Sequence, residues 1–157
     1  MRIERKYMAH FIRTAEMEKF VRLGKDLEEY SPEISATVDS HRNILGQKRI
    51  AITGYDKSVS VEPYYAEKED PLFAHLQDVL DRDAVMEELK VEVLDVKLWE
   101  EYTVDTYFAN LEDAYLEITS YGGDVNGYRI GFKLHFTGVK KRGTFNVVDH
   151  VFEELGE

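Results

Sequence analysis

The chain has 157 residues, no cysteine and a formal net charge of −11 at pH 7. This length suits one domain with a hydrophobic core of its own, and the absence of cysteine excludes disulfides and cysteine-based metal sites. No apolar run approaches the roughly 20 residues that span a bilayer, and residues 1–10 lack the apolar region of a secretory signal. We therefore expect no membrane contact and a product that stays in the cytoplasm of the cell that makes it.

The acidic balance bears on nucleic-acid binding. The 31 Asp and Glu residues outnumber the 20 Lys and Arg residues, whereas a protein that grips phosphates needs a basic surface. An acidic surface aids solubility, and it would also suit a wall that weakly repels passing phosphates. The charge argues against tight DNA binding and leaves these two explanations open.

Alternation with a period of two residues dominates the chain and predicts β-strands. In residues 129–137 one face carries the apolar residues Ile130, Phe132, Leu134 and Phe136. Residues 115–121 alternate in the same way, and residues 122–127 between them include three glycines. Because glycine tolerates the backbone angles of tight turns, these segments predict a β-hairpin.

A second, earlier hairpin is expected from residues 34–39 and 49–53, which also alternate. The residues between them would form its tip: Asn43, Ile44, Leu45 and Gly46. Two further strands are expected at residues 58–62 and 90–99.

Two details of the later strands are specific enough to test. The apolar phase of residues 90–99 slips between Val93 and Leu94, which suggests a bulge or a twist. Residues 138–143 are expected to form a basic turn before a last strand that contains Phe145 and Val147; the turn carries Lys140, Lys141 and Arg142.

One amphipathic helix is predicted after residue 70. Asp70 is a suitable N-cap and Pro71 suits the first helical position. The apolar side chains then fall on one helical face, which we expect to pack on a sheet: Leu72, Phe73, Leu76 and Leu80. With no linker or repeat in the sequence, we expect one domain of mostly antiparallel β-structure over residues 1–157.

Catalytic and metal-binding patterns are not evident. The chain has neither a Gly-x-Ser-x-Gly elbow nor a phosphate-binding P-loop. Its histidines do not have the helical spacing of a zinc motif: His10, His41, His75, His135 and His150. We expect no catalytic residue, cofactor or metal, although an enzyme that uses scattered His and Glu remains an alternative. The ten tyrosines would suit a protein interface, where their area and polar tip are favoured.

Short motifs are spread over most of the chain, in residues 23–29, 31–33, 43–46, 60–66, 70–73, 76–77, 96–100, 120–124, 127 and 143–145. Their order and spacing resemble the major tail tube proteins of long-tailed phages and prophages of Gram-positive bacteria. The resemblance covers about residues 8 to 148, whereas residues 1–8 and 149–157 match nothing in that pattern. We expect these two ends to be flexible.

The resemblance implies a mainly β fold in which two antiparallel sheets pack together as a sandwich or barrel. One α-helix flanks the sheets, and a long hairpin or loop joins early strands. It also implies a virion structural protein, without enzyme activity or cofactor, that is assembled in the host bacterial cytoplasm. Such subunits form hexameric rings that stack into a tube, with DNA passing through the lumen. The implied partners are further copies of the chain and other tail proteins, such as the tape measure and the terminator.

Two sites are expected to serve assembly. Residues 43–46 place apolar Ile44 and Leu45 at a hairpin tip, where they would bury against another subunit. The basic residues 140–142 are expected opposite carboxylates of a neighbour, with a solvated turn as the alternative. A small β-barrel that binds a ligand is the competing function.

Overall fold

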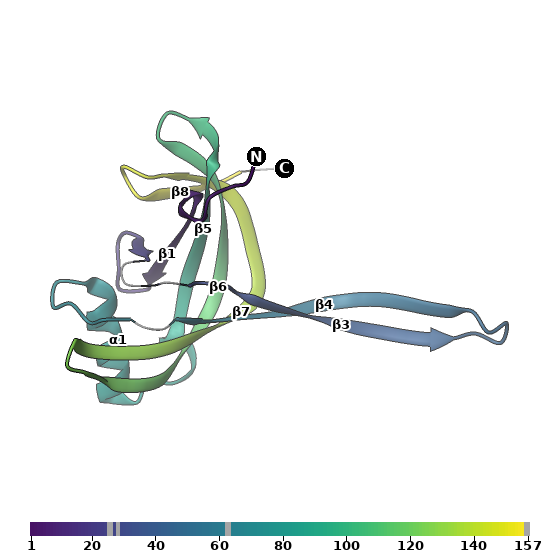
Figure 1. The fold of residues 1–157 in the computed structure, drawn as a ribbon, viewed down its shortest axis with the longest axis horizontal. Helices are drawn as coiled ribbons and strands as arrows, with labels where there is room; N and C mark the ends of the chain where they lie inside the picture. The colour runs from purple at the N-terminus through teal and green to yellow at the C-terminus, as the bar shows by residue number, and fades with distance from the viewer. Residues whose placement is uncertain (25–26, 28, 62–63, 156–157) are drawn as a thin grey trace.

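The computed structural model describes residues 1–24, 27, 29–61 and 64–155. Within them the chain forms eight strands in one antiparallel sheet, in the order β2-β1-β5-β6-β7-β4-β3, with β8 added to β7 (Figure 1). The strands are β1 Met8–Thr14, β2 Val21–Leu23, β3 Glu33–Arg42, β4 Lys48–Val61, β5 Lys90–Thr103, β6 Thr106–Asp124, β7 Gly127–Asn146 and β8 Val151–Glu154. Some residues of the expected motifs and of the C-terminal end lie outside the described residues: Lys25, Asp26, Glu28, Glu62, Pro63, Gly156 and Glu157.

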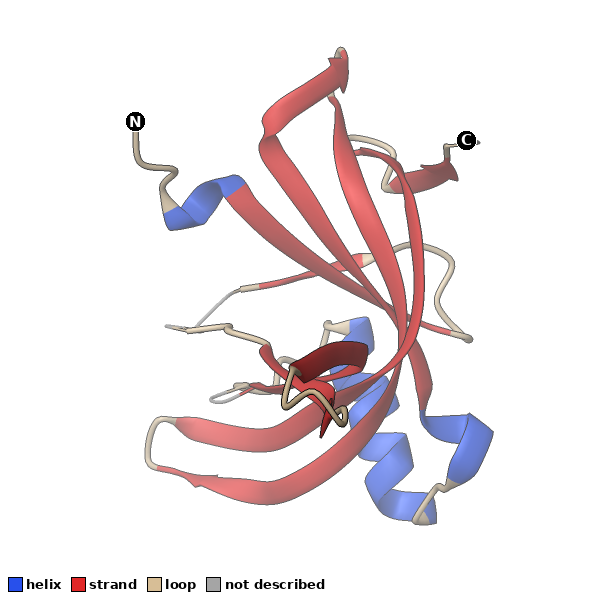
Figure 2. Cartoon of the chain, turned by 90° about the vertical axis from the view of Figure 1, so that its right-hand side faces the viewer, coloured by secondary structure: helices blue, strands red, loops and turns tan. Residues whose placement is uncertain are grey.

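The mainly β class is as predicted. The strands form one continuous sheet, however, where two packed sheets were expected. Strands β6 and β7 have 19 and 20 residues and run through the whole body, where shorter strands were expected. Register shifts between Glu112 and Ala114 and between Ile118 and Ser120 bend the pair. The sheet is also open, because β2 and β3 lie at opposite ends of the strand order. Figure 2 shows the long strands fanning out at one end and curving together towards the helix at the other.

The sheet buries opposite faces at its two ends. One cluster, the helix-side core, contains Ile12, Val91, Val93, Leu116 and Phe132, together with residues of the helix. The other, the C-terminal core, contains Phe11, Phe20, Leu94, Leu111 and Phe145. Because neighbours along a strand point to opposite faces, each strand that crosses the body changes the face that it buries.

This change of face explains the phase slip in β5. Of the two expected causes, a bulge or a twist, the bulge was wrong. Val93 and Leu94 are both buried, one in each core. Their pairing with β1 and with β6 is continuous, and the register shifts of β5 lie beyond Val96. A slip in apolar phase can therefore mark a second covered face, with no extra residue in the strand.

The predicted helix is confirmed as α1, Pro71–Arg82. The Asp70 side chain accepts a hydrogen bond from the Leu72 backbone N–H, and Asp83 ends the helix in a left-handed conformation. Leu72 and Leu76 are buried in the helix-side core, and Phe73 and Leu80 are partly buried against it. Two 3-10 helices are also present, η1 Arg5–Tyr7 and η2 Met86–Leu89. None of the helices in the described ranges is long and apolar enough to span a bilayer.

Both expected hairpins are present, whereas the basic turn is not. Strands β6 and β7 meet at Val125 and Asn126, and β3 and β4 meet at residues 43–47. Residues 138–143 lie inside β7, because residues 110–112 of β6 pair with residues 140–142. Gly138 adopts a positive φ there, which a strand can absorb as a local irregularity.

Candidate functional site

The β3–β4 hairpin projects from the body as a two-stranded extension (Figure 1). We call residues 33–57 the arm. Every residue of β3 is exposed, and so is most of β4 up to Lys57, where the strand enters the body. A two-stranded ribbon with no covering layer has little stability of its own in water, so what the arm contacts decides what it does.

The two faces of the arm differ in composition. Cross-strand partners share a face, and the pairs Ala36–Tyr55, Val38–Ile52 and Ser40–Ile50 place the apolar residues together. We call this the apolar arm face, and it consists of Ile34, Ala36, Val38, Ile50, Ile52 and Tyr55. The other face carries Ser35, Thr37, Asp39, His41, Arg49 and Asp56.

The apolar arm face continues the face that holds the helix-side core. Along β4, Lys57, Val59 and Val61 have the same alternation as Tyr55, and Val59 and Val61 are fully buried in that core. In the arm the same face is open, with Ile50 63% and Ile52 56% exposed. Exposed apolar side chains that form a contiguous stripe indicate a surface that another molecule covers.

The tip of the arm is a well-formed turn with apolar side chains pointing outwards. The Asn43 side-chain oxygen accepts hydrogen bonds from the backbone N–H groups of Leu45 and Gln47, at 2.9 and 3.0 Å. Gly46 has a φ of 77°, a conformation that suits glycine. Ile44 and Leu45 are exposed, so the tip is ordered by its polar residues and the apolar ones are available for contact.

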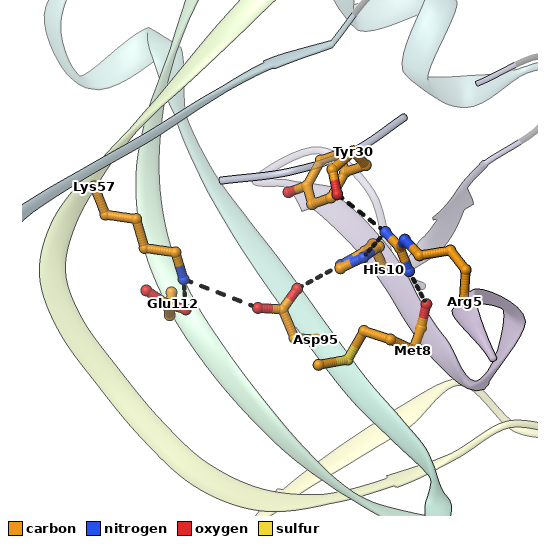
Figure 3. A network of polar contacts seen from close by, with 7 residues as sticks. All are labelled: Arg5, Met8, His10, Tyr30, Lys57, Asp95 and Glu112. Atoms are coloured by element: carbon orange, nitrogen blue, oxygen red, sulfur yellow. Dashed lines mark hydrogen bonds and ion pairs between the residues drawn. The ribbon is translucent and has the colours of Figure 1, made fainter. Parts of the chain in front are cut away.

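A polar network fixes the point at which the arm joins the body (Figure 3). Lys57 Nζ donates to Glu112 Oε1 at 2.6 Å and lies 4.0 Å from Asp95 Oδ2. It also lies 4.6 Å from the centre of the Phe136 ring. Glu112 is almost fully buried, and a buried carboxylate needs such a partner to offset its desolvation. Lys57 therefore ties β4 to β5 and β6.

The same network extends to the N-terminal segment. His10 Nδ1 lies 2.6 Å from Asp95 Oδ1, and its Nε2 lies 2.6 Å from Arg5 Nη2. A guanidinium can only donate, so Nε2 accepts and the ring proton lies on Nδ1, which donates to Asp95. Arg5 also donates to the backbone oxygens of Met8 and Tyr30. These hydrogen bonds connect residues 5–8 to the body. The flexibility expected of residues 1–8 and 149–157 stays a prediction.

The basic residues of β7 lie where the edge of the sheet opens. The Arg142 backbone oxygen still accepts a hydrogen bond from the Leu155 N–H at 3.0 Å. On the side away from β6, strand β7 pairs with β4 at residues 132–135 and with β8 at residues 143–146. Between them lie Lys140, Lys141 and Arg142, all exposed. Alternation divides them, because Lys140 and Arg142 line one groove with Glu100 and Glu154 whereas Lys141 faces the other way. Charges at an open edge discourage unspecific strand pairing.

Three further titratable side chains, His75, Tyr30 and His135, are buried or have a charged neighbour. His75 lies on the buried face of α1, where burial lowers its pKa. Both of its ring nitrogens lack a hydrogen-bond partner among the described residues. Burial also raises the pKa of Tyr30 well above its usual range. His135 lies 3.1 Å from Glu117 on an exposed face. In the part of the chain that the structure describes, no group of three His, Asp or Glu side chains is placed to hold a metal ion.

Sequence reasoning found the tip of the arm but missed its apolar face. The alternation in residues 34–39 and 49–53 predicts two strands of a hairpin but does not tell which face is left open. The signal that could have shown more is the 16-residue stretch 40–55, which contains no Asp or Glu in a strongly acidic chain. The network around Lys57 leaves no such sign, because its members come from distant segments.

Solved structures of phage tail assemblies resemble this fold. The chain is similar to the tail tube of phage SPP1 with a TM-score of 0.61 and 13% sequence identity, over 90% of this chain and 78% of that chain. It is also similar to a chain of the six-fold symmetrised baseplate of the anti-feeding prophage, with a TM-score of 0.46, 11% identity and coverage of 89% and 93%. No family model and no curated protein matches the sequence. The similarity to SPP1 shows that the chain has the tail tube fold, as the sequence predicted.

Proposed function

We propose that this chain is the structural subunit of a phage tail tube, and that it assembles into stacked hexameric rings whose lumen conducts DNA. The observation that carries the proposal is the arm. It extends the core-bearing face of the sheet beyond the body as an exposed apolar stripe, on a chain with the tail tube fold. An apolar face of this kind costs free energy in water, and a neighbouring subunit would remove that cost.

The acidic balance supports a passage that does not hold DNA. Each phosphate that a Lys or Arg neutralises strengthens binding and slows release. A lumen wall with an excess of carboxylates would not bind phosphates in this way. The chain has 31 acidic residues that could form such a wall. DNA would pass without specific binding, and the partners of the tube would be other tail proteins, such as the tape measure and the terminator, in the virion.

Electron microscopy of the concentrated purified protein tests the proposal. We expect rings or tubes. Ile44→Asp with Leu45→Asp should leave a folded subunit that no longer polymerises, because each carboxylate would have to be buried without a partner. Val148→Asp is the matched control, since Val148 is an exposed apolar residue outside the arm. Normal tubes from the double variant would show that the tip is not an assembly contact.

The basic residues of β7 give a second test of assembly. We propose that Lys140, Lys141 and Arg142, which point to both faces of the β7 edge, meet carboxylates of a neighbouring subunit on both faces and help to set its register. Replacing all three with Glu should abolish assembly at low salt, where charge contacts are least screened. Unaltered assembly, or a tube structure with these residues on the lumen wall, would contradict this placement.

A further inference from the structure

An apolar groove runs between the helix and strand β6. It has a volume of about 660 Å³. Its walls are mainly apolar side chains from α1, from η2 and from β6: Val79, Leu80, Leu89, Leu116, Ile118 and Tyr121. Tyr121 is 71% exposed, so the groove opens to solvent and a side chain could enter it without unfolding any element.

The rim of the groove is strongly acidic. Asp83 lines it, and Glu87 and Glu88 precede the lining residue Leu89. The Glu117 carboxylate lies beside His135 on the opposite face of β6. Residues 78–88 contain five carboxylates and a single basic residue, Arg82. Arg82 is occupied by Asp78 at 2.7 Å and Glu88 at 3.3 Å. The groove therefore favours a partner with apolar side chains that enter the groove and basic side chains around them that face the rim.

The arm has this chemistry. Ile44 and Leu45 are the exposed apolar residues of its tip, and Arg42, Lys48 and Arg49 flank them. No Asp or Glu occurs in residues 40–55. The distal arm is therefore positively charged in a chain of net charge −11. Its charge is opposite in sign to that of the groove rim.

The arm cannot reach the groove of its own subunit. The helix lies on the side of the body opposite to the arm (Figure 1), and Lys57, bound to Glu112 and close to Asp95, fixes the root of the arm. An arm that enters this groove must therefore come from another copy, which makes the contact head-to-tail and able to propagate.

We propose that the groove between α1 and β6 receives the arm tip of a second copy of this chain. Ile44 and Leu45 enter between the helix and the sheet, and Lys48 and Arg49 face Glu87 and Glu88. This inference rests on the tail tube proposal and names the receptor for the arm within it.

The absence of cysteine allows a direct test by cross-linking. In the variant Leu45→Cys with Tyr121→Cys, the two new thiols are the only ones in the chain. Tubes treated with an oxidant should give a ladder of covalent multimers, because a disulfide needs its Cβ atoms within about 4 Å. Leu45→Cys with Val148→Cys is the matched control and should stay monomeric on a denaturing gel.

A charge swap tests the same contact without a covalent bond. Lys48→Glu with Arg49→Glu, and separately Glu87→Lys with Glu88→Lys, should each lower the amount of tube about tenfold or more at low salt, because like charges then face each other. The chain with all four changes should recover most of the loss. Lys19→Glu with Lys68→Glu, at exposed sites outside the arm and groove, is the control for net charge.

The outcomes separate this inference from the tail tube proposal. Tubes from the unaltered chain, with a covalent ladder and recovery in the four-fold variant, would support both. Tubes without the ladder, or without recovery, would overturn the groove as receptor and leave the tail tube proposal standing. No rings or tubes from the unaltered chain would overturn both.

Discussion

The body and the arm contain the same sequence pattern and have opposite surroundings. Strand β4 belongs to both, with Ile50 and Ile52 open in the arm and Val59 and Val61 buried in the body. The period of two residues is the same in both parts, because it depends only on the pleat of the strand. A register shift at Thr53 keeps the apolar residues of the two parts on one face. What differs is the layer above it, which α1 and the other strands supply in the body and which the arm lacks. Alternation thus identifies an apolar face without telling what covers it.

Lys57 marks the point at which the arm enters the body. Removing its ion pair with Glu112 should have the largest effect on stability. Lys57→Met leaves Glu112 buried without its cation, which should cost about 3–5 kcal/mol of unfolding free energy. Urea denaturation measures this. The double variant with Glu112→Gln should recover part of the loss, because the unpaired charge is removed. Equal stability of the single variant and the unaltered chain would show that the network does not hold the root of the arm.

The next largest effect on stability should come from a core residue of α1. Leu76 is fully buried in the helix-side core, so Leu76→Ala removes buried methyl groups and leaves a cavity. We expect a loss of about 2–5 kcal/mol, measured as a lower urea midpoint with an unchanged slope. Asp81→Ala, at an exposed residue of α1, is the matched control. An unchanged melting temperature for Leu76→Ala would contradict the packing of α1 on the sheet.

The body should also respond to pH through His75. Burial lowers the pKa of His75 below its ordinary 6.5, so the ring is neutral in the folded chain and takes up a proton more readily when unfolded. Stability is therefore present above about pH 6.5 and falls as the pH drops below it, by at most about 1.4 kcal/mol per pH unit for one proton. Unfolding of His75→Phe at pH 7.5 and 5.5 should show a smaller difference than the unaltered chain. His41→Asn, in the arm, is the control, and an equal loss of pH dependence there would contradict the assignment.

The smallest effect on stability should come from the arm. Ile50→Asp with Ile52→Asp changes residues that are exposed in the subunit, so unfolding free energy should stay within about 0.5 kcal/mol. Tube formation should be lost, because the apolar arm face could no longer be covered. This variant separates stability from assembly. A clear drop in melting temperature would show that these residues are not free in the subunit. Normal tubes would show that the apolar arm face is not an assembly contact.

The sequence by itself determined the local elements. Asp70 and Pro71 fixed the start of the helix, and the glycines at residues 122–127 fixed the β6–β7 hairpin, because capping and turn geometry depend on nearby residues only. The alternation around residues 43–46 fixed the early hairpin for the same reason. The general class of the fold followed from these elements and from the motif order.

Only the tertiary structure decided how the elements share their faces. Val93 and Leu94 are neighbours that lie in two different cores, and Lys140 to Arg142 lie inside a strand because β6 pairs with them. Lys57, Glu112, Asp95 and His10 meet although β1 and β6 are far apart in the chain. Such contacts depend on long-range pairing, which brings together residues whose spacing in the sequence carries no periodic signal.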